Sequence, residues 1–102
     1  MVAKKKLKVN WTTKAAQSLE NHYQRIKEKS PQSADRVRKE IFKATNELPA
    51  HPKKYQVDEY YPKGSGEIRR FFKWSYRIVY EIQEQTIDIL NVIHTSQEPF
   101  TE

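Results

Sequence analysis

The chain has no cysteine, only two glycines and no long hydrophobic run. Without cysteine, neither a disulfide framework nor a cysteine-based metal site can form, and a reducing compartment fits this composition. No apolar segment follows the N-terminal lysines, so the sequence predicts no membrane span, no membrane partner and a cytoplasmic location. A chain of 102 residues has room for one modest core, which predicts a single domain over residues 1–102.

Positive charge is concentrated in the first half of the chain. The net charge is +6, and residues 1–54 carry 14 of the 19 cations but only 5 of the 13 acids. An excess of this kind favours an anionic partner, either a nucleic acid or an acidic protein, and it also promotes solubility. Charge alone therefore leaves both kinds of partner open.

Residues 13–29 and 31–48 are predicted to be helices, because apolar residues recur in them at spacings of three and four. Thr12-Thr13 offers an N-cap for the first helix, and Ser30-Pro31 is a strong start signal for the second. Few residues separate the two segments, so the pattern predicts an antiparallel helical hairpin.

Four segments alternate apolar and polar residues with the period of a strand. They are residues 7–11, 68–74, 76–83 and 86–94. A shorter strand is predicted around residues 55–57, and a glycine-containing loop at 63–66. The element order predicts an α+β fold, with the antiparallel helical hairpin packed on a four-stranded, mainly antiparallel sheet. Alternation in the third segment places Tyr76 and Ile78 on the packed face and Arg77 on the other, where it offers charge to an anionic partner.

The element order and several short motifs resemble the RelE/ParE toxins of bacterial type II toxin–antitoxin systems, and this resemblance covers nearly the whole chain. The motifs are Val9-Asn10-Trp11-Thr12, Ser30-Pro31, Ile68-Arg69-Arg70-Phe71, Tyr76-Arg77-Ile78-Val79-Tyr80 and Ile89-Leu90-Asn91-Val92-Ile93-His94. The resemblance implies a growth-inhibiting, plasmid-stabilising toxin that a cognate antitoxin neutralises. It implies no cofactor and no metal.

Two branches of the family imply two different targets. One branch cleaves mRNA in the ribosome without metal, and the other poisons DNA gyrase. Such cleavage requires a base, an acid and cations that stabilise the phosphorane. For a nuclease, the resemblance implies catalytic roles for Arg70, Arg77 and His94, with Asp58 or Glu59 as a loose candidate for the base.

The tail of the chain bears on the choice between these targets. Residues 95–102 supply neither a cation nor a tyrosine, which slightly favours inhibition of gyrase over a ribosome-dependent endonuclease. A basic binding module without toxicity is a third possibility.

The same residues also have structural interpretations. Arg77 can pair with Glu81 or stack on an aromatic ring, and His94 can be a hydrogen-bonded residue at a strand end. His22 and His51 have no partners at ligand spacing and are predicted to lie at the surface. If Arg77 is a surface residue, its truncation should destabilise the fold by less than about 1 kcal/mol.

Overall fold

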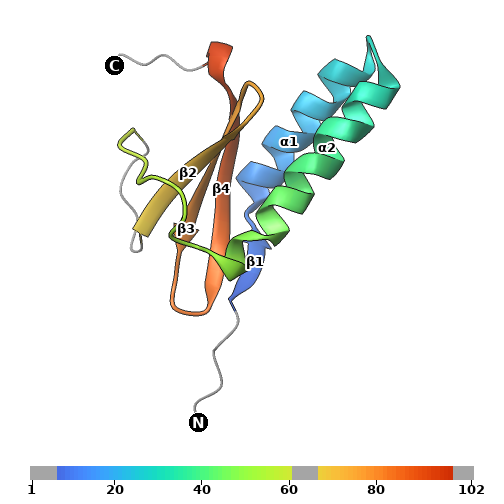
Figure 1. The fold of residues 1–102 in the computed structure, drawn as a ribbon. Coiled ribbons are helices and arrows are strands. Elements are labelled where there is room, and N and C mark those ends of the chain that lie inside the picture. The colour runs from blue at the N-terminus through green and yellow to red at the C-terminus, as the bar shows by residue number, and fades with distance from the viewer. Residues whose placement is uncertain (1–6, 61–66, 98–102) are drawn as a thin grey trace.

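Two helices cover one face of a four-stranded sheet (Figure 1). The computed structural model describes residues 7–60 and 67–97. The elements are β1 (Lys8–Trp11), α1 (Thr13–Lys27), α2 (Pro31–Asn46), the 3-10 turn η1 (Leu48–Ala50), β2 (Glu67–Lys73), β3 (Tyr76–Ile82), β4 (Thr86–His94) and η2 (Thr95–Gln97). The predicted α+β fold is confirmed. The loop predicted at 63–66 and the end of the tail lie outside the described residues.

The strand order is β1-β4-β3-β2, with β1 parallel to β4 and the other pairs antiparallel. The parallel pair is possible because the helical hairpin carries the chain from β1 to the far edge of the sheet. The pairing of β3 with β4 shifts between Val79 and Tyr80, where β4 contains one extra residue. Within the described ranges, no helix is long and apolar enough to cross a membrane.

Side-chain caps fix where each helix starts. The Thr12 hydroxyl accepts a hydrogen bond from the Ala15 N–H at 3.2 Å and donates one to the Ile89 carbonyl at 2.7 Å. The same residue therefore begins α1 and fastens it to β4. Ser30 accepts from the Ser33 N–H at 3.2 Å, and proline at position 31 provides the first helical residue of α2.

The hydrophobic core fills the space between the helical hairpin and the sheet. Its buried members come from both helices, η1 and the three longer strands: Ala15, Leu19, Ile41, Leu48, Phe71, Tyr76, Ile78, Tyr80, Ile87, Ile89 and Val92. Strand alternation therefore predicted the packed face of β3 correctly.

The other face of β3 is buried as well, and this corrects the expectation of an open basic surface. Arg77, Val79 and Glu81 all lie on that face, and each is at most 6% exposed. A strand with both faces covered has no solvated side, so alternation alone cannot show that an arginine on it is accessible.

Candidate functional site

Arg77 forms a buried ion pair on the sheet face that is turned away from the helices. Its Nη1 contacts Oδ2 of Asp58, and the two residues are 5% and 6% exposed. The Asp58 N–H donates to the Ile68 carbonyl at 3.0 Å, and Oδ1 of Asp58 accepts from the Tyr60 N–H at 2.8 Å. The predicted surface position of Arg77 is therefore wrong, because the chain around Asp58 covers it.

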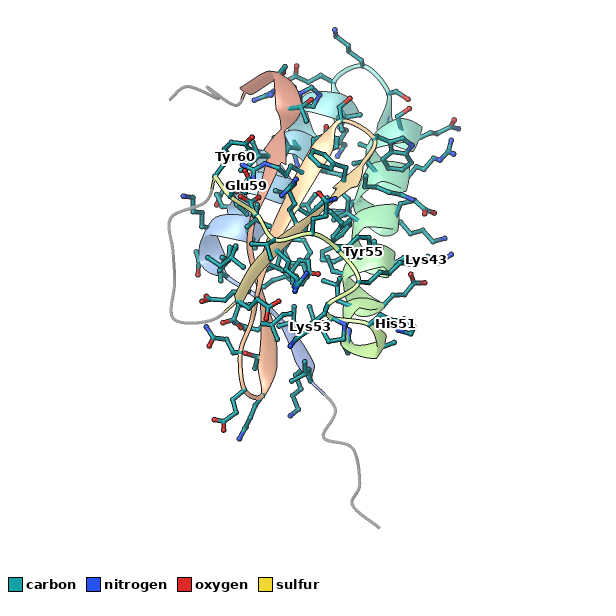
Figure 2. All side chains as sticks on the ribbon, turned by 60° about the vertical axis from the view of Figure 1, so that its left-hand side comes forward. Lys43, His51, Lys53, Tyr55, Glu59 and Tyr60 are labelled. Carbon is teal, nitrogen blue, oxygen red and sulfur yellow. The ribbon has the colours of Figure 1, made fainter. Side chains whose placement is uncertain are left out.

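Arg70 holds the same stretch of chain. Its Nη2 donates to the side-chain oxygen of Gln56 at 3.1 Å, and its Nη1 donates to the Val57 carbonyl. Val57 also forms an isolated antiparallel β-bridge with Arg69. The strand predicted around residues 55–57 is therefore reduced to this one backbone pairing. Figure 2 shows this stretch, between the labelled Tyr55 and Glu59, crossing in front of the strands. We call residues 56–58 the crossing segment.

His94 lies on the opposite face from the two arginines. It pairs in register with Tyr76, a core residue, and the two rings meet edge to face at 5.0 Å. Its Nδ1 accepts from the Ser96 N–H at 3.1 Å and lies 2.7 Å from the Ser96 hydroxyl. The structure therefore places Arg70 and Arg77 on one face of the sheet, both bonded to the crossing segment, and His94 on the other face.

The two tyrosines of β3, Tyr76 and Tyr80, are placed for packing in the core. Burial raises the pKa of Tyr80 to about 12, although the nearby Arg69 lowers it, and the Tyr80 hydroxyl donates to the Pro52 carbonyl at 2.7 Å. Burial also raises the pKa of Tyr76. Both hydroxyls therefore keep their protons near neutral pH and are poorly suited to accept one from a substrate.

Asp58, the candidate general base, is also committed to internal contacts. It is buried and accepts hydrogen bonds from Arg77 and from the Tyr60 N–H. A base must reach the proton that it removes, either directly or through one water. RNA would have to break the bonds from Arg77 and the Tyr60 N–H before its 2′-hydroxyl could meet this carboxylate.

Two further carboxylates lie on the same face of the sheet as Arg70 and Arg77. Glu81 and Asp88 sit opposite each other on β3 and β4, and the Asn10 side-chain amide donates to Asp88 at 3.2 Å. Within residues 7–60 and 67–97, no group of three or more histidine, cysteine, aspartate or glutamate side chains could hold a metal ion.

His22 is a buried residue that the sequence interpretation wrongly assigned to the surface. It is 5% exposed, its Nε2 lies 2.9 Å from the Val92 carbonyl, and its ring meets Tyr76 at 5.0 Å. Burial lowers the pKa of His22 below the usual 6.5. This outweighs the bond to Val92, which favours the charged ring, and the nearby charges of Arg25 and His94 lower the pKa further.

This burial predicts how stability depends on pH. Because the folded pKa of His22 is lowered, the unfolded chain takes up a proton first as the pH falls below about 6.5. The contribution of His22 to stability should be complete above that pH and should decline below it, by no more than about 1.4 kcal/mol per pH unit. His22→Gln keeps a donor for the Val92 carbonyl but cannot titrate. Urea unfolding of both proteins from pH 7.5 to 5 should show a smaller decline for the variant, and parallel curves would contradict this.

Comparisons with known proteins now decide the family. A family model described as the ParE toxin of the type II toxin–antitoxin system parDE matches residues 9–99. The chain belongs to the ParE toxin family. This match confirms the family that the motifs indicated. The cognate partner of the chain is therefore an antitoxin.

A solved structure agrees with this fold. The chain resembles a structure from the chromosomal ParDE toxin–antitoxin system of Pseudomonas aeruginosa, with a TM-score of 0.70 and 18% identity over 89% of this chain and 98% of that one. It also matches TrmO from Pseudomonas aeruginosa, with a TM-score of 0.48 and 16% identity over 90% of this chain and 37% of that one. No curated protein sequence matches the chain. For a ParE family member, the mixed sheet and helical hairpin are thus the expected architecture.

Proposed function

We propose that this ParE family toxin inhibits DNA gyrase and acts in the cytoplasm, where gyrase works on the chromosome. Membership of the ParE family supports this target, because gyrase inhibition is the activity of that branch. The observation that carries the proposal is the buried pair between Arg77 and Asp58. It occupies the arginine and the candidate base that a metal-independent nuclease would use on RNA.

The distribution of the other candidates supports the same conclusion. RNA cleavage needs an acid, a base and a cation around one phosphate. Here His94 lies on the face opposite Arg70 and Arg77, and both tyrosines of the motif have raised pKa values. A toxin that acts by binding its target needs no such convergence.

Two assays on the purified toxin test this proposal. We expect the toxin to inhibit supercoiling by gyrase and to leave mRNA intact on programmed ribosomes. Adding the cognate antitoxin should restore supercoiling, which controls for a contaminating inhibitor. Cleavage of ribosome-bound mRNA without any effect on gyrase would establish the endonuclease instead.

Arg70→Ala sharpens the comparison, because Arg70 is only partly buried and its loss should leave the fold in place. In a nuclease, losing a cation beside the phosphorane should lower the cleavage rate roughly a hundredfold.

If neither assay responds to wild-type toxin, the proposal fails and the protein is a binding module without toxicity towards these targets.

A further inference from the structure

The solvent sides of the two helices differ in charge, although both helices lie side by side on the same sheet (Figure 1). On α2, the residues opposite the buried Ala34 and Ile41 recur at spacings of four, three and four, and we call them the basic stripe: Gln32, Arg36, Lys39 and Lys43. On α1, the same spacing opposite Ala15 and Leu19 gives a stripe without a cation: Thr13, Gln17, Glu20 and Gln24. Solubility alone therefore does not require three cations on one side of α2.

The cations of the basic stripe are accessible. Arg36, Lys39 and Lys43 are exposed, and they lie within about 60° of arc and about 10 Å along the helix axis. Among residues 7–60 and 67–97, no acidic side chain forms an ion pair with any of the three. The Arg36 guanidinium carbon lies 5.9 Å from the ring centre of Trp74, a contact that leaves its charge in place. Figure 2 shows Lys43 projecting from α2 away from the sheet.

The two acids of α2 are engaged on the flanks of the stripe. Glu40 pairs with Lys73 of β2 at 3.7 Å. Asp35, on the other flank, accepts a hydrogen bond from the Tyr23 hydroxyl of α1 at 2.8 Å. The basic stripe between them contains no acid, so its positive charge is not balanced within the stripe.

The composition of the basic stripe suits phosphates better than a protein surface. The centres of protein interfaces are depleted of lysine and depend on aromatic anchors, whereas phosphates are bound by lysine, arginine and amide side chains such as Gln32. One strand of duplex DNA presents about three phosphates over 10 Å of its axis, which equals the number of cations. The major groove of duplex DNA admits a helix, whereas that of A-form RNA is too narrow. An exposed basic helix therefore fits DNA better than RNA.

We infer that α2 binds the phosphate backbone of duplex DNA through Arg36, Lys39 and Lys43. This inference goes beyond the function proposed above, because the toxin can contact DNA whether or not it inhibits gyrase. Contacts to phosphates carry no sequence information, so the complex is independent of base sequence. Each contact releases counterions from the DNA, so the complex weakens as salt is added.

The experiment measures binding of the toxin to a labelled duplex of mixed sequence by fluorescence anisotropy, without gyrase. Three phosphate contacts predict a slope of about −2.7 for log K against log salt, or about a fortyfold loss of affinity between 50 and 200 mM salt. In Lys39→Gln/Lys43→Gln only Arg36 remains, so the slope should fall to about −0.9. Glutamine has nearly the helix propensity of lysine, so the circular dichroism spectrum should not change.

Lys8→Gln/Arg25→Gln is the matched control, because it removes two exposed cations that lie outside α2. Its slope should stay at the wild-type value. An equal loss of slope in this control would show that binding is spread over the whole basic surface, and it would overturn the inference. Absence of DNA binding by wild type at 50 mM salt would overturn it as well.

Two other ligands distinguish DNA from the alternatives. Tighter binding of the wild type to duplex RNA of the same sequence would assign the basic stripe to RNA. Weaker binding of Lys39→Gln/Lys43→Gln to the cognate antitoxin, at unchanged DNA affinity, would assign it to the antitoxin. Either result overturns the inference. A toxin that binds DNA with the predicted slope but does not inhibit gyrase would retain the DNA site and lose only the proposed function.

Discussion

Replacing Arg77 by alanine should lower the free energy of unfolding by about 3–5 kcal/mol, because it leaves the Asp58 carboxylate buried without its charge partner. The side chains of Arg77 and Asp58 are 7% and 0% exposed. A pair this deep is poorly screened by solvent, unlike the surface charge that the sequence suggested. Urea unfolding at pH 7 measures the change. The urea concentration at the midpoint should fall while the m-value stays the same.

A matched surface variant and a neutral pair control this result. Arg25 is an exposed arginine on α1, and Arg25→Ala should cost less than about 1 kcal/mol. Asp58→Asn combined with Arg77→Gln removes both charges and leaves neither one buried alone. The double variant should therefore lose less stability than Asp58→Asn and Arg77→Gln lose when their separate effects are added. A loss below about 1 kcal/mol in Arg77→Ala would show that the pair is solvated in solution. Loss of toxicity in this variant has to be judged against its folded fraction.

The helices and strands were predictable because their signals are local. Thr12 and Ser30-Pro31 each act within the helix that they cap, and the predicted starts at residues 13 and 31 are correct. Alternation along β3 placed Ile78 in the core for the same reason. The helices end at residues 27 and 46, slightly before the predicted ends, since helix ends carry weaker signals than starts.

The candidate site depended on contacts that no local pattern records. Asp58 and Arg77 are separated by 19 residues, and whether the crossing segment covers the sheet is a property of the whole fold. His22 is a different case, because a local signal was present. It follows Leu19 by three residues and precedes Ile26 by four, so it continues the buried stripe of α1. A histidine on that stripe should have been assigned to the interior, where a backbone carbonyl can satisfy it.

Ile41→Ala should destabilise the protein by about 2–5 kcal/mol, the usual range for large-to-small changes in a core. Ile41 is fully buried and belongs to the cluster that joins α2 to the sheet. The neighbouring Lys39 is exposed on the same helix, so Lys39→Ala should change stability by no more than about 0.5 kcal/mol. Denaturant unfolding of the two variants beside wild type makes the comparison, and equal effects would contradict the packing of α2.

The milder variant Ile41→Val tests whether the two faces of the sheet are energetically independent. Ile41 packs on the helix-covered face, whereas the ion pair of Arg77 and Asp58 lies on the other. Changes without shared partners usually add within about 0.5 kcal/mol. Ile41→Val should therefore cost about 0.5–1.5 kcal/mol both in wild type and in the neutral double variant of the ion pair. A clearly larger cost in the neutralised background would mean that β3, buried on both faces, transmits a packing change through the sheet.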